Sequence, residues 1–146
     1  MEVLFVCTHN AGRSQMAEAL FNRLAQERGL QVRAESAGTE PAETVHPEMT
    51  EMMRELDLDL SGNRPKLLTN EMVRRAGRVV TMGCAPDATS CPVLFIRRVD
   101  DWALPDPHGQ PLERVRAIRD EIRQRVEALI GEIAATGVSE TERQEH

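Results

Sequence analysis

A continuous apolar run at residues 3–6 leads straight into a loop that carries a cysteine, a glycine and an arginine. The run does not alternate with polar residues, which is typical of a strand covered on both faces in a parallel sheet. Helical periodicity follows at once over residues 13–28, and Gly29 marks the end of that helix. A buried strand that passes directly into an amphipathic helix favours an α/β fold.

The alternation of strands and helices continues along the chain. Further strands are predicted at 32–37, 78–82 and 93–96, and further helices at 47–58, 69–76 and 112–133. This order predicts a single α/β domain with a four-stranded parallel sheet and helices on both faces. We assign residues 1–135 to that domain and expect 136–146 to form a polar, frayed C-terminal tail.

The composition excludes several classes of function. The net charge of −6 argues against a nucleic-acid or anionic-membrane binder, and no apolar run approaches the ~18 residues that cross a bilayer. The first residues do not form a secretory signal, and the odd count of three cysteines does not form a disulfide framework. We therefore expect a cytoplasmic protein, acting as a monomer, with no metal and no bound cofactor.

The loop after the first strand has the features of an anion site. Backbone N–H groups of such a loop and the N-terminus of the following helix converge on one point, which suits a tetrahedral oxyanion. The candidate oxyanion-binding residues are Thr8, His9, Asn10, Ala11, Gly12, Arg13 and Ser14. We call residues 7–14 the cradle.

The types of residue in the cradle point to nucleophilic chemistry. Cys7 lies where the field of the loop favours the thiolate, which is the nucleophilic form. Arg13 can hold two oxygens of an anion with its planar fork. Asn10 tolerates the left-handed backbone that a tight loop needs, and the Ser14 hydroxyl can donate to the thiolate. A buried structural cysteine beside an unrelated arginine is the alternative.

An acid is needed to protonate the leaving oxygen, and Asp106 is the candidate. It lies between two prolines in a loop after the last predicted strand, from which it can reach the strand ends. The same Asp-Pro pair is also an ordinary turn.

The other two cysteines, Cys84 and Cys91, follow the strand at 78–82 and precede the strand at 93–96. If the residues between them were helical, their Cα atoms would lie about 10.5 Å apart, beyond the ~7 Å reach of a disulfide. Pairing them would therefore need a change of backbone, and two thiols that never meet are the alternative.

These residues together resemble the low-molecular-weight protein tyrosine phosphatase superfamily and, within it, the thioredoxin-coupled arsenate reductases. The resemblance covers about residues 2–133. It rests on Val6 through Glu18, on Ser36-Ala37-Gly38-Thr39, on Val79 through Cys84, on Cys91-Pro92, and on Trp102 with Asp106-Pro107. The pair Cys84 and Cys91 separates the reductases from the plain phosphatases.

The resemblance implies reduction of arsenate to arsenite by a relay of three thiols. Cys7 attacks arsenate held by Arg13, while Asp106 protonates the departing hydroxyl. Cys84 then attacks the sulfur of Cys7, arsenite leaves, and Cys91 moves the disulfide to the 84/91 pair. External thioredoxin reduces that pair.

The resemblance also implies a place for a potassium ion in some reductases, at positions that correspond to Asn10, Glu18, Ser36 and an acid. Lys66 stands in this sequence where the acid is expected. We therefore expect the lysine ammonium to replace the ion.

Two other functions remain open at this point. One is a phosphatase acting on phosphoesters, with Cys84 and Cys91 protecting Cys7 from oxidation. The other is a non-catalytic thiol sensor or anion-binding module, which has no use for Asp106. The three histidines considered as bases, His9, His46 and His108, are interpreted as ordinary loop or turn residues.

Overall fold

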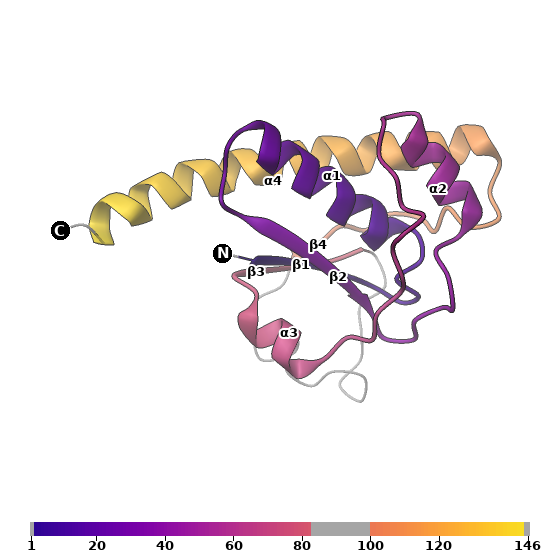
Figure 1. Cartoon of the computed structure of the whole chain (residues 1–146), viewed down its shortest axis with the longest axis horizontal. Coiled ribbons are helices and arrows are strands. Elements are labelled where there is room, and N and C mark those ends of the chain that lie inside the picture. The colour runs from indigo at the N-terminus through magenta and orange to yellow at the C-terminus, as the bar shows by residue number, and fades with distance from the viewer. Residues whose placement is uncertain (1, 83–99, 145–146) are drawn as a thin grey trace.

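The computed structural model describes residues 2–82 and 100–144, with side chains described as far as residue 135. Its sheet has four parallel strands in the order β2-β1-β3-β4, namely β1 (Glu2–Cys7), β2 (Arg33–Gly38), β3 (Arg78–Thr81) and β4 (Asp100–Asp101). Helices α1 (Arg13–Glu27), α2 (Pro47–Arg54) and α4 (Leu112–Gln144) lie on one face and α3 (Asn70–Arg75) on the other (Figure 1). The predicted fold class is confirmed.

Both faces of β1 are buried, which explains its unbroken apolar run. Val3 and Phe5 belong to the core under α1, α2 and α4, whereas Leu4 and Val6 belong to a second core with residues of α3. The ring of Phe5 also lies 5.5 Å from that of Trp102, centroid to centroid. The strand that ends in the cradle is therefore fixed from both sides.

The described part of the last strand lies beyond the range predicted for it. The expected strand at 93–96 lies outside the described residues, and the strand that pairs with β3 is Asp100–Asp101. Two aspartates do not have the apolar pattern by which a buried strand is predicted. Polar side-chain contacts hold them instead: Asp100 pairs with Arg78 at 2.9 Å, and Asp101 accepts from the Thr81 hydroxyl at 2.7 Å.

The ends of the first two helices show why one was predicted well and the other was not. Gly29 takes a left-handed backbone with φ +68°, and Leu30 N donates to Ala25 O at 2.9 Å, so α1 stops as the glycine predicted. Helix α2 ends in a similar way, but Asp57 with φ +59° takes the left-handed place. An aspartate is a weaker stop signal than glycine, so the prediction ran α2 four residues too far.

Helix α4 buries most of its predicted apolar stripe. Val115, Ile118, Ile122, Val126, Leu129, Ile130 and Ile133 are buried, but Leu112 is 51% exposed. The helix continues to Gln144 rather than ending near residue 133, and it projects beyond the sheet (Figure 1). The tail assigned to 136–146 thus starts inside a helix, and the boundary at 135 stays a prediction. Within the described ranges, no helix has the length and apolar character needed to span a bilayer.

A cluster of charges joins α4 to the end of α2. Glu55 accepts from Arg116 at 2.8 and 3.0 Å and from Arg119 at 2.7 Å, and Arg119 also donates to the carbonyl of Met52 at 2.9 Å. These hydrogen bonds, from Arg116 first and then from Arg119, lower the pKa of Glu55 to about 2. The ionised carboxylate therefore stabilises this junction.

Replacing Glu55 by glutamine should lower the melting temperature at neutral pH and much less in acid. Because the pKa of Glu55 is lowered to about 2 from an ordinary 4.5, its contribution is complete above pH 4.5 and is lost as the pH falls through 2. Thermal melts of both proteins between pH 2 and 7 measure the effect, with Glu51→Gln on the same helix as a control. A difference that stays constant with pH would contradict this origin.

Candidate active site

The cradle begins at the carboxyl end of β1 and ends in the first turn of α1. Gly12 precedes the helix with φ −141° and gives it no side-chain cap, and Met16 N donates to Gly12 O at 3.0 Å. The N-terminus of α1 is therefore turned towards the loop without a capping side chain between them. This arrangement favours an anion at that point.

Cys7 lies on the floor of the cradle and is 3% exposed. Its Sγ is 2.7 Å from the hydroxyl of Ser14 and accepts from the backbone N of Asn10 at 3.2 Å. Both neighbours can donate to a negative sulfur, as the sequence predicts for Ser14. The geometry therefore suits a thiolate nucleophile.

Asn10 fixes the shape of the loop. Its backbone is left-handed with φ +51°, as predicted, and its side chain is fully buried. The amide donates to Ser14 Oγ at 2.8 Å, while Oδ1 accepts from Gln15 at 3.1 Å and from the backbone N of Lys66 at 2.8 Å. Gln15 and the Lys66 backbone were not predicted, because a single sequence gives no signal for contacts of this kind.

The end of β2 packs against the cradle so closely that only glycine fits. A Cβ at Gly38 would lie 2.5 Å from Thr8 O and 2.9 Å from Asn10 N. Both are backbone atoms, which cannot move aside without changing the loop. Further contacts hold the same loop, because Glu40 N donates to Thr8 O at 2.8 Å and His46 N donates to Ala11 O at 3.0 Å.

Arg13 joins the cradle to two other strand ends. Its Nη1 donates to the carbonyls of Met82 at 2.6 Å and of Leu104 at 2.7 Å. These bonds set the direction of the half-buried guanidinium, which carries further N–H donors on Nε and Nη2. Binding of an oxyanion by Arg13 stays a prediction. Besides its predicted role at the anion, the Arg13 side chain thus also holds the loop that carries Asp106.

Asp106 is exposed in the loop between β4 and α4, which we call the acid loop (residues 102–109). Its carboxylate accepts from the backbone N of His108 at 3.0 Å. The loop is anchored at its start, where the buried Trp102 donates its backbone N–H to Thr81 O at 2.7 Å. Asp106 therefore lies in a supported loop whose start is bonded to the carboxyl end of β3.

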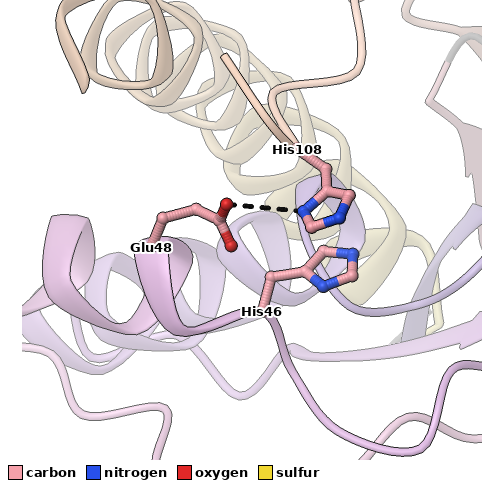
Figure 2. Close-up of side chains that lie close together, drawn as sticks. All are labelled: His46, Glu48 and His108. Atoms are coloured by element: carbon pink, nitrogen blue, oxygen red, sulfur yellow. Dashed lines mark ion pairs between the residues drawn. The ribbon is translucent and has the colours of Figure 1, made fainter. Parts of the chain in front are cut away.

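The structure brings together two histidines that the sequence reading left as ordinary loop residues. The rings of His46 and His108 are stacked with centroids 3.7 Å apart, and Glu48 Oε2 is 3.4 Å from His108 Nδ1 (Figure 2). Burial, and then the neighbouring His108, lowers the pKa of His46. Both residues lie in loop or turn positions, as interpreted, but the contact between their rings was not predicted. His9 also lies in a loop, with Nδ1 3.0 Å from Glu40 O.

The remaining predicted site residues, Cys84 and Cys91, lie outside the described residues. Their roles stay predictions.

The residues at which the resemblance implies a potassium ion, together with Lys66, lie close together in the structure. The Lys66 ammonium lies 3.8 Å from Glu18 Oε1 and 3.8 Å from Glu35 Oε1, and the Ser36 hydroxyl donates to Glu18 at 3.1 Å. Burial raises the pKa of Glu18, although Lys66 opposes this shift. The lysine thus brings a positive charge to the position that the resemblance gives to an ion.

Potassium should leave the melting temperature of the protein unchanged, because the Lys66 ammonium repels a second cation beside Glu18. Changing Lys66→Asp should create a rise that is specific to potassium, with Lys66→Gln as the control for loss of charge alone. Melts in potassium and in sodium at equal ionic strength measure this. A potassium-specific rise in the unchanged protein would show that the site exists despite the lysine.

Comparison with known sequences gives a family match over nearly the whole chain. Residues 2–139 match the family described as low molecular weight phosphotyrosine protein phosphatase. A Halobacterium salinarum protein, provisionally named an arsenate reductase, is 42% identical over 130 residues, which are 88% of this chain and 89% of that protein. Arsenate reductase of Staphylococcus aureus is 34% identical over 126 residues, 86% of this chain and 92% of the relative.

Solved structures with the same fold include both reductases and phosphatases. An arsenate reductase in its phosphate-binding state matches with TM-score 0.78 and 34% identity, over 90% of this chain and 98% of that one. An arginine phosphatase matches with TM-score 0.79 and 27% identity, over 92% and 96% of the two chains. Because the family match covers nearly the whole chain and the cradle is built as described, the chain belongs to the low molecular weight phosphotyrosine protein phosphatase family.

Proposed function

We propose that this chain, an arsenate reductase on the low-molecular-weight phosphatase fold, works through a relay of three cysteines that thioredoxin regenerates. The observation that carries the proposal is the cradle, where the Cys7 sulfur lies 2.7 Å from the Ser14 hydroxyl in the first turn of α1 and accepts from the backbone N of Asn10 in the loop before it. It acts on a small oxyanion, as a monomer in the reducing cytoplasm where thioredoxin works.

The first step forms a bond between sulfur and arsenic. The Cys7 thiolate attacks arsenate, and one arsenic hydroxyl leaves as water after Asp106 gives it a proton. Arg13 holds the remaining oxygens, and its bonds to Met82 and Leu104 bring the acid loop to the same place. The chain has no tyrosine and carries His108-Gly109 after the acid, where a phosphatase would hold a phenyl ring, which favours an inorganic substrate.

The next steps carry the electrons. The Cys84 thiolate attacks the Cys7 sulfur, and the electron pair of the S–As bond stays on arsenic, which is reduced from arsenate to arsenite. The Cys91 thiolate then attacks Cys84, which frees Cys7 and leaves a disulfide between Cys84 and Cys91. A dithiol donor reduces that disulfide, so that two electrons enter for each arsenite released.

The names of two relatives mention different thiol proteins. A matching structure is the thioredoxin-dependent arsenate reductase of Corynebacterium glutamicum, with TM-score 0.74 and 36% identity over 92% of this chain and 62% of that one. A Synechocystis relative, 34% identical over 134 residues, is named a glutaredoxin arsenate reductase. Three cysteines in one chain complete the relay without an external monothiol, which favours thioredoxin.

The order of the relay can be tested by trapping it. Changing Cys91→Ser should leave the first turnover nearly intact and accumulate a disulfide between Cys7 and Cys84, because nothing in the chain can then resolve that bond. Changing Cys84→Ser should stop the reaction before arsenite leaves. Peptide mass mapping after one equivalent of arsenate reads out both results.

The unchanged protein is the control for this trap, and it should carry the disulfide between Cys84 and Cys91. A bond between Cys7 and Cys91 in the unchanged protein would reverse the assigned order. Full multiple turnover by Cys91→Ser with thioredoxin as the donor would remove Cys91 from the relay.

A further inference from the structure

His46, Glu48 and His108 lie close together, although 60 residues separate the last two in the sequence (Figure 2). One ligand atom from each residue can be chosen so that all three lie within 4.8 Å of one another. Two imidazoles and a carboxylate are the donor set that proteins use for zinc and similar divalent ions. We propose that these residues form a binding site for a divalent ion of the zinc class, which clamps the acid loop to α2.

The backbone around the three residues is already fixed. Pro47 is the first residue of α2 and lies between His46 and Glu48, and Pro107 lies between Asp106 and His108. Proline fixes its own φ and restricts the residue before it, so His46 is restricted directly and the segment that leads to His108 has one free torsion fewer. His46 is also bonded to the cradle through its backbone N–H and Ala11 O at 3.0 Å.

The present stack is not yet the geometry of a metal site, because the ring planes differ by only 14° and an imidazole binds a metal in its own plane. Ligand atoms about 2.1 Å from a tetrahedral ion lie roughly 3.4 Å apart, so the three must move closer together and one ring must turn. The torsion that turns an imidazole is soft, and the His108 side chain is 52% exposed. Binding should therefore break the stack without moving either backbone.

The charges around the group favour a cation. Glu48 supplies one negative charge at the site, its side chain is 25% exposed, and Asp106 lies near enough to act on His46 electrostatically. The His46 ring lies against that of His108 with centroids 3.7 Å apart, so both imidazoles are next to the carboxylate.

The site would act on the acid loop. The Asp106 carboxylate accepts from the backbone N of His108 at 3.0 Å, so an ion held by the His108 ring restrains Asp106 as well. The opposite side of the site is the start of α2, which is bonded to the cradle through His46. A bound ion therefore joins the two segments that flank the place of the substrate.

The test uses the full chain with Zn²⁺ as the probe and nitrogen NMR of the histidine rings as the readout. We expect saturable Zn²⁺ binding that shifts one ring nitrogen each of His46 and His108 and leaves His9 in place. Binding should also raise the melting temperature and slow hydrogen exchange over 104–110. Glu48→Gln and His108→Asn should each lose these shifts, whereas Glu51→Gln on the same helix should keep them.

The readout separates this site from binding at the thiols. If Zn²⁺ is taken up while both imidazoles stay unshifted, the ion is bound elsewhere, as at the cysteines, and the proposal is wrong. If the imidazoles shift but exchange over 104–110 is unchanged, the ion does not clamp the acid loop. Because none of these readouts depends on turnover, their failure leaves the proposed reductase function untouched.

Discussion

Replacing Cys7 by serine should abolish arsenate reduction, because a neutral hydroxyl is a far weaker nucleophile than a thiolate held in the cradle. The loss should be complete in single turnover as well as at steady state, since Cys7 forms the first bond to arsenic. Production of arsenite by the purified variant measures it. Retention of more than a few per cent of the turnover would remove Cys7 from the nucleophile role.

The controls for Cys7→Ser are the melting temperature of the variant and its affinity for an anion in the cradle. An oxygen fits at this position, because it is smaller than sulfur and a serine hydroxyl can also bond to Ser14 and to the backbone N of Asn10. The variant should therefore melt close to the unchanged protein and still bind phosphate in the cradle. Loss of phosphate binding would mean that the substitution had damaged the loop, and the kinetic result would then say nothing of the sulfur.

Replacing Asp106 by asparagine should slow the first chemical step by about 10²- to 10⁴-fold, the usual range for a general acid. Asparagine keeps an oxygen that can accept from the His108 backbone N–H, so the acid loop should keep its shape. Single-turnover rates over a range of pH measure the effect, because the variant should also lose the limb of the profile that reports the acid.

The exposed Glu113 in the first turn of α4 provides a control acid for Asp106, and Glu113→Gln should leave rate and profile unchanged. If Asp106→Asn also leaves both unchanged, another group must protonate the departing oxygen.

The parts of this structure that the sequence predicts are those with a local cause. The unbroken apolar run of β1 reflects burial on both faces, and Gly29 and Asn10 stand where the backbone is left-handed. Thr69 is of a residue type that favours the position before a helix, and its hydroxyl accepts from Met72 N at 3.2 Å at the start of α3. In each case the physical requirement falls on one residue or on its near neighbours, so a single sequence records it.

The parts that were missed depend on contacts between distant residues. The two bonds of Arg13 to the carbonyls of Met82 and Leu104 need the ends of three segments to meet, and carbonyls carry no signal in a sequence. The stack of His46 on His108 likewise joins a helix start to a loop that follows the last strand. Neither residue repeats with a period or belongs to a local motif, so only the folded chain reveals the pair.

The most direct measurement is steady-state oxidation of NADPH by arsenate with thioredoxin and thioredoxin reductase, beside a phosphoester assay on the same preparation. We expect oxidation that needs both arsenate and thioredoxin and that disappears in Cys84→Ser, with far weaker hydrolysis of the phosphoester. The contrary result is hydrolysis that survives Cys84→Ser and Cys91→Ser while arsenate drives no oxidation of NADPH; the protein would then be a phosphatase whose two other cysteines take no part in turnover.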